Sequence, residues 1–437
     1  MKTIITFLGF TPPIRNLEET QYEYRGEIYE GEVFAVALDQ FCDYDKMLVC
    51  VTPGAKASTW LKLKELGKLN NNRVELVEIP TGKNNAEMWE IFETITARIN
   101  PHESVIFDIT HGLRMLPFLV FLFAAYLKSA KQVEISAVYY GALELRDRSK
   151  NEPAPVIDLS EFVSMFDWIT ATTRFTETGD GQALAALLYA ASPSKDELKY
   201  KPDVRPYQTI AKAAKSIEST SLALSLARPI EVMKSASQLE DFLVKAKDGI
   251  AQRAKPFSLL SEQVLEQYGQ FALALPEELD NVRESLSQQF HMIGWYLKRD
   301  RIIQATTLMR EWIVSVLMWK FGLGEMMMGK KVRGQVENAL GNAAADQKSE
   351  NDRPAKRLES LYEENMQALD NVQNIGQLWG QLGYIRNDLA HVGMKSSRSP
   401  ASTLKENANK IFGELEACIL PLIEPLSSED AGDTIAP

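Results

Sequence analysis

An arginine and a histidine near the C-terminus, Arg386 and His391, are the residues best suited to do chemistry together. They stand five positions apart, so on a continuous helix of ~3.6 residues per turn their side chains diverge by about 140° and flank a groove. Gly393 is expected to end this helix and to leave His391 in its last turn, where the helix dipole favours the imidazolium form.

This pair suits the cleavage of RNA without a metal ion. The 2′-hydroxyl attacks the adjacent phosphate, a histidine moves a proton near neutral pH, and a guanidinium offsets the charge on the phosphorane. Asn387, directly after the arginine, could orient the phosphate. The arginine and histidine could instead serve helix capping or a surface ion pair, and the spacing alone leaves both interpretations open.

A second polar segment, Asp108-Ile109-Thr110-His111-Gly112, lies between a predicted buried strand and an apolar helix. Such a turn aims free helix N-terminal amides at the edge of a sheet, which suits a phosphate, and Arg114 and His111 could add donors. Asp108 and Thr110 could instead cap the helix while His111 bonds locally. Neither G-x-G-x-x-G nor G-x-x-x-x-G-K-[ST] occurs, which disfavours a dinucleotide cofactor and a Walker-type triphosphate site.

The elements that must position this segment are predicted from the first ~150 residues, where β-branched runs alternate with helix-like segments. This pattern predicts a parallel sheet with helices on both faces. Five strands are expected, each apolar enough to be buried on both faces: Thr3–Leu8, Met47–Val51, Val74–Ile79, Ser104–Phe107 and Val133–Tyr139. Small and polar residues follow every strand, and in an open parallel sheet those ends share the edge where ligands bind.

Beyond Val156 the sequence changes to long amphipathic stretches, which predict a mainly α-helical second half. A polar stretch with three prolines, 193–206, is expected to connect helices, and 342–354 is a second polar break. The expected domains are 1–170, 171–290 and 291–426, followed by a disordered tail, 427–437.

Composition excludes several classes. The three cysteines have no metal-type spacing, and no export signal or membrane-length apolar run is visible, so we expect a cytoplasmic chain without a metal site or cofactor. The net charge of −11 opposes non-specific coating of nucleic acid. Any RNA contact must be local; the cluster Lys330, Lys331 and Arg333 is one candidate, although such runs are more often solvated loops.

Together the motifs resemble the CRISPR-associated DxTHG-motif family, in which a CARF sensor domain precedes a HEPN ribonuclease domain. Segment 108–112 matches the motif that names the family, and Arg386 to His391 match the HEPN Arg-x-x-x-x-His pattern, including its common Asn. The helical passage 162–180 looks like the region that follows the sensor. The resemblance implies a Rossmann-like α/β CARF domain (1–170), a helical connecting domain (171–290) and an all-α region ending in a HEPN domain (291–426).

The resemblance also implies the activity. Two chains, or a higher homo-oligomer, would bind a cyclic oligoadenylate at their sheet-edge loops, cyclic tetra-adenylate before cyclic hexa-adenylate. The paired HEPN domains would then cleave single-stranded RNA through Arg386, Asn387 and His391, leaving a 2′,3′-cyclic phosphate. Slow cleavage of the activator by the sensor stays open. The named motif and the sheet-edge argument together give the expected activator contacts: Gly9, Thr11, Thr52, Gly54, Thr81, Lys83, Asn84, Asp108, Thr110, His111, Gly112 and Arg114.

Two other functions remain possible from the sequence. The chain could be a non-enzymatic ligand-sensing regulator whose helical half binds DNA or a partner, although no basic recognition helix is evident. It could also be an enzyme acting on a free nucleotide at the sheet edge, with a purely structural helical half.

Overall fold

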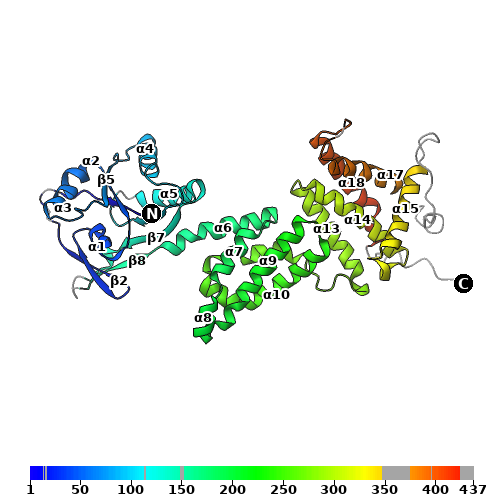
Figure 1. The fold of residues 1–437 in the computed structure, drawn as a ribbon, viewed down its shortest axis with the longest axis horizontal. Coiled ribbons are helices and arrows are strands. Elements are labelled where there is room, and N and C mark those ends of the chain that lie inside the picture. Colours follow the sequence, from blue (N-terminus) through cyan, green and yellow to red (C-terminus); the bar gives the residue numbers. More distant parts are fainter. Residues whose placement is uncertain are drawn as a thin grey trace, which may run out of the picture. The chain divides into compact units, whose positions relative to one another are not determined.

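The computed structural model describes residues 1–12, 14, 17–112, 115–147, 152–346, 375–394 and 396–423. The chain divides into two compact units, Met1–Asp167 and Trp168–Pro437. The first contains the sheet and the second is helical (Figure 1).

The first unit is built on an eight-stranded sheet with the order β3-β2-β8-β7-β6-β1-β4-β5. Its parallel part consists of the five predicted strands, each found within two residues of its expected bounds. The strands are β1 (Lys2–Leu8), β2 (Thr20–Tyr24), β3 (Glu27–Gly31), β4 (Lys46–Val51), β5 (Val74–Glu78), β6 (Ser104–Asp108), β7 (Glu134–Gly141) and β8 (Ala154–Asp158).

The sheet is mixed rather than purely parallel, which corrects the prediction. Strand β8 pairs antiparallel with β7, and β2 and β3 form an antiparallel hairpin at the edge. The hairpin strands carry charged or polar residues at most positions, so they lack the apolar signature used to find the others. Their turn is Arg25-Gly26, with both φ angles positive (55° and 85°), and it lacks the Asn-Gly signature that usually marks such turns.

Helices cover both faces of the sheet, as predicted. On one face α1 (Phe34–Phe41) and the short α2 (Pro53–Ala55), η1 (Lys56–Trp60) and α3 (Leu61–Glu65) pack on the strands. On the other face lie α4 (Asn85–Thr96) and α5 (Leu116–Lys131). Strand β1 is buried on both faces, because Ile4 is buried in the first layer and Ile5 in the second.

The second unit is all-helical in its described residues, as expected, and has one continuous core from Trp168 to Ile423. The 193–206 stretch holds the short helix α8 (Lys195–Tyr200) and the start of a 3₁₀ helix, η3 (Pro202–Gln208), between longer helices. Helix α6 (Ser160–Thr178) begins in the first unit and continues into the second. The other helices among the described residues are α7 (Gln182–Ala191), α8 (Lys195–Tyr200), α9 (Thr209–Ser225), α10 (Pro229–Arg253), α11 (Lys255–Ser258), α12 (Ser261–Gly269), α13 (Val282–Lys298), α14 (Ile302–Lys320), α15 (Lys330–Asp346), α17 (Ile375–Ala390) and α18 (Ala401–Cys418).

One predicted break is partly wrong. Residues 342–346 continue α15, because Ala343 and Ala345 are buried and Asn342 is only 7% exposed, so this polar stretch has a packed face. The rest of that stretch and the predicted disordered tail, 427–437, lie outside the described residues.

Candidate functional site

Asp108 ends β6 and is completely buried. One of its carboxylate oxygens accepts a hydrogen bond from the Thr6 hydroxyl at 2.6 Å, and the other accepts one from the Thr110 N–H at 2.8 Å. Burial raises the pKa of this carboxyl group. Asp108 therefore ties the following turn to strand β1, and it does not cap α5, whose N-cap is Met115.

Thr110 and His111 fasten the same turn to two other elements. The Thr110 hydroxyl accepts from the Gly141 N–H of β7 at 2.8 Å, and His111 Nε2 accepts from the Phe34 N–H of α1 at 3.2 Å. An accepting Nε2 carries no proton, and burial lowers the pKa of His111, so the imidazole is neutral. These side chains position the turn. The alternative of helix capping by Asp108 and Thr110 is wrong, and the partner of His111 lies 77 positions away in the sequence, so its bond is not local.

Two cavities open where this turn meets the ends of the parallel strands. The smaller has about 90 Å³ and is lined by Phe7, Leu8, Gly9, Phe10, Cys50, Thr52, Ile79 and Gly112. The other has about 470 Å³ and is lined by Ile109, Thr110, His111, Gly112, Pro117, Tyr140 and Leu159. Gly112 lines both, and its φ of +125° is one that side chains rarely adopt. Five of the twelve predicted contacts thus come together here: Gly9, Thr52, Thr110, His111 and Gly112.

The other predicted contacts have different neighbours. The Thr59 hydroxyl lies 2.6 Å from the Gly9 carbonyl and 2.8 Å from the Thr11 hydroxyl, and Ser58 Oγ donates to the Gly54 carbonyl. The two Thr59 bonds join the first strand-end loop to the second, whereas the Ser58 bond lies within the second.

Side chains of the loop after β5 form the hydrogen bonds that begin helix α4. The Asn84 side chain caps this helix by accepting from the Glu87 N–H at 2.9 Å. Glu87 in turn accepts from the Lys83 N–H and the Thr81 hydroxyl, and these bonds lower its pKa. Thr81, Lys83 and Asn84 line neither of the two sheet-edge cavities, and Arg114 lies outside the described residues.

The sequence prediction missed two aromatic residues at these cavities. Phe10 directly follows Gly9, lines the smaller cavity and leaves 62% of its surface exposed. Tyr140 lines the larger one and donates to Glu144 at 2.5 Å, a bond that raises the pKa of Tyr140 to about 12. An exposed aromatic ring beside a hollow can stack on a nucleobase. The sequence signal for Phe10 was an apolar side chain directly after Gly9, in a loop that follows a strand.

The second predicted site lies at the end of α17. Arg386, Asn387 and His391 are all exposed. The helix ends at Ala390, one residue before His391, whose N–H still bonds to the Asn387 carbonyl at 3.2 Å. Val392 and Gly393 follow with positive φ, so the chain leaves the helix where Gly393 predicted a stop.

The buried neighbour of this site fixes the loop that follows. Asp388 is 1% exposed and accepts from the Ser399 N–H at 2.9 Å. Three apolar side chains beside the exposed pair, Tyr384, Val392 and Met394, are 50, 73 and 85% exposed. The end of α17 therefore presents a guanidinium, an amide and an imidazole on a partly apolar surface.

Two negative findings concern the described residues alone. They contain no helix long and apolar enough to cross a membrane. In the same part of the chain, His, Cys, Asp and Glu side chains form no cluster that could hold a metal ion.

Comparison with known proteins covers the first two thirds of the chain. Residues 3–144 match the family described as CRISPR system endoribonuclease Csx1, CARF domain, and residues 164–288 match CRISPR-associated protein MJ1674, second domain. The CRISPR-associated protein MJ1674 of Methanocaldococcus jannaschii is 29% identical over 131 residues. That match covers 29% of this chain and 20% of the relative's length.

These matches agree with the residues that carried the resemblance. The first covers the predicted sensor, including segment 108–112, and the second covers the helical region that follows it. The Rossmann-like CARF fold followed by a helical region is therefore confirmed, and the HEPN identity of the last helices stays a prediction. Together the matches show that the chain has an N-terminal CARF domain, followed by a region similar to the second domain of a CRISPR-associated protein.

Proposed function

We propose that the chain is an endoribonuclease that cleaves single-stranded RNA when a cyclic oligoadenylate binds its CARF domain. The observation that carries this proposal is the exposed Arg386, Asn387 and His391 at the end of α17 in a chain that begins with a CARF domain. The name of the matching family, an endoribonuclease of CRISPR systems, supports the same activity.

The sheet-edge cavities support a ligand that carries both phosphates and bases. Glycines at positions 9 and 112 let the ligand approach the backbone, and exposed Phe10 offers a stacking surface for adenine. Cyclic tetra-adenylate is the first ligand to test and cyclic hexa-adenylate the second.

A dimer would complete both sites. Arg386 and His391 are exposed to solvent in one chain, so two copies that bring their α17 ends together would enclose the scissile phosphate. In the sensor, α5 exposes Phe118, Phe121, Leu122 and Tyr126. An apolar group of this kind, on a helix that otherwise packs against a sheet, fits a protein–protein interface.

The chemistry needs only side chains of this chain. In a two-fold site, the neutral His391 of one copy accepts the 2′-hydroxyl proton while the 2′-oxygen attacks phosphorus. The protonated His391 of the second copy donates its proton to the departing 5′-oxygen. Arg386 offsets the charge of the phosphorane and Asn387 orients its oxygens, so the products are a 2′,3′-cyclic phosphate and a free 5′-hydroxyl.

The test is an RNA cleavage assay with a panel of cyclic oligoadenylates, in the presence of EDTA. We expect cleavage by the full chain only with one member of the panel, and none by His391→Ala. His291→Ala is the matched control, because His291 is exposed on α13, and it should cleave normally. Cleavage without activator, or full activity of His391→Ala, would overturn the proposal.

A further inference from the structure

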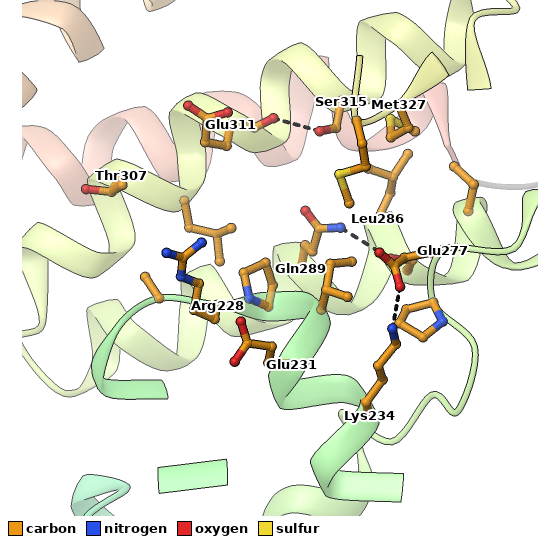
Figure 2. A pocket seen from close by; sticks show the side chains of 18 of the residues that line it. Arg228, Glu231, Lys234, Glu277, Leu286, Gln289, Thr307, Glu311, Ser315 and Met327 are labelled. Atoms are coloured by element: carbon orange, nitrogen blue, oxygen red, sulfur yellow. Dashed lines mark hydrogen bonds and ion pairs between the residues drawn. The ribbon is translucent and has the colours of Figure 1, made fainter. Parts of the chain in front are cut away.

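The helical unit contains a cavity of about 510 Å³ between α10, α13 and α14 (Figure 2). This volume lies within the range of about 300–1,000 Å³ that small-molecule sites occupy. Part of its wall is apolar, formed by Ile230, Val282, Leu286 and Leu308. The cavity shares no residue with the sheet-edge cavities or with the Arg386 and His391 motif.

The charged residues around this cavity are not all paired. Lys234 pairs with Glu277, and Arg333 pairs with Glu311 at 2.7 Å. These pairs neutralise four of the six charges that line the cavity. Arg228 and Glu231 are the remaining two, and within the described parts of the chain neither side chain forms an ion pair. A guanidinium without a carboxylate partner is free to bind an anion.

The free arginine stands at the start of a long helix. Arg228 is the N-cap of α10, a helix of 25 residues, and no side chain accepts a hydrogen bond from the first turn. Pro229 and Ile230, at the beginning of this turn, also line the cavity. The positive end of a helix together with a free guanidinium is a combination that binds phosphate.

A buried amide provides an independent indication of a ligand. Gln289 on α13 is only 8% exposed and lines the cavity, and Figure 2 shows its side chain among the residues that surround the open space. Its Nε2 donates to Ser285 Oγ at 3.3 Å. Its carbonyl oxygen accepts no hydrogen bond from the described residues. An amide oxygen held in this way can accept from the amino group of a nucleobase.

We propose that this cavity binds one nucleotide, either free or as an unpaired residue of an RNA strand. The phosphate binds Arg228 and the start of α10. The base lies on the apolar wall and donates to Gln289, and the Glu231 carboxylate accepts from the ribose hydroxyls. This proposal goes beyond the nuclease activity and does not depend on it.

The test is calorimetric titration of the full chain with AMP, GMP, CMP and UMP. Adenosine and inorganic phosphate are titrated separately, because each contains only part of the ligand. We expect one mononucleotide to bind, with affinity about tenfold or more lower in Arg228→Ala and in Gln289→Leu. Arg205→Ala, which removes an exposed arginine outside the cavity, is the matched control and should bind normally.

Further arms distinguish the source of the nucleotide and the site that binds it. A single-stranded RNA is titrated into His391→Ala; tighter binding than by any mononucleotide, weakened by Arg228→Ala, identifies RNA as the source. Mononucleotide binding must persist in Gly9→Val, a variant that fills the smaller sheet-edge cavity and leaves the cavity of the helical unit unchanged. The proposal is wrong if the binding of no mononucleotide or RNA depends on Arg228 and Gln289, or if inorganic phosphate alone binds there.

Discussion

The residues of segment 108–112 serve mainly to hold the sensor turn in place. Asp108, Thr110 and His111 bond to β1, β7 and α1, while Gly112 lines both sheet-edge cavities. This division explains how one short motif can shape a ligand site with few side chains facing the ligand.

Asp108→Asn tests this structural role. An amide presents a donor where the carboxylate accepts from two donors, so one buried bond is lost. We expect the free energy of unfolding to fall by about 1–3 kcal/mol, measured by chemical denaturation of the full chain. Asp43→Asn, at an exposed position, is the control and should leave stability unchanged. Equal stability of the two variants would contradict the role assigned to Asp108.

His111 should make the stability of the sensor depend on pH. Burial lowers its pKa in the folded chain, so below the unfolded value of about 6.5 the unfolded state binds a proton that the folded state does not. Stability should therefore decrease as the pH falls from about 7.5 to 5.5. His111→Gln keeps an acceptor without this titration, and its thermal unfolding should change less over the same range. Parallel curves for the two proteins would refute the assignment.

Phe10 is the side chain for which we expect the largest effect on ligand binding. Loss of base stacking typically costs about 1–3 kcal/mol. Phe10→Ala should therefore weaken binding of the cyclic oligoadenylate by roughly five- to 150-fold in titration calorimetry, whereas Phe10→Tyr should retain it. An affinity unchanged in Phe10→Ala would exclude stacking at this position.

At the scale of elements, the β2–β3 hairpin depends on a turn of unusual sequence. Gly26 adopts a φ of 85°, which costs a residue with a side chain about 1 kcal/mol or more. Gly26→Ala should lower the melting temperature of the sensor by a few degrees. Gly269→Ala, at a glycine without a positive φ and with open space around it, is the control. A Gly26→Ala protein as stable as the control would show that the hairpin tolerates another turn.

The parallel strands could be predicted because each contains a run of β-branched and other apolar residues. The expected burial on both faces is wrong for the edge strand β5, where only Val77 is buried. Strands β2 and β3 could not be predicted, since only Tyr22 and Gly31 are buried among their residues and an edge strand needs little apolar surface. The sheet edge could be predicted as a ligand site because the parallel strands end there. The side chains that line its cavities could not all be predicted. Phe10 lines its cavity because of a loop conformation that no spacing rule describes, whereas Tyr140 lies near the end of β7.

At the scale of the whole molecule, the chain joins a CARF domain to a helical unit that exposes Arg386 and His391. The proposed function requires that the ligand of one unit controls chemistry in the other. It also assigns the two properties to different residues, because Phe10 should determine affinity for the activator and His391 the rate of cleavage.

The most direct test is the rate of RNA cleavage measured against activator concentration. Phe10→Ala should shift the half-activating concentration upward by about the factor lost in binding and leave the maximal rate unchanged. His391→Ala should abolish the maximal rate while its affinity for the activator stays normal. An RNA cleavage rate that does not respond to the activator, or that responds identically in wild type and Phe10→Ala, would contradict the account.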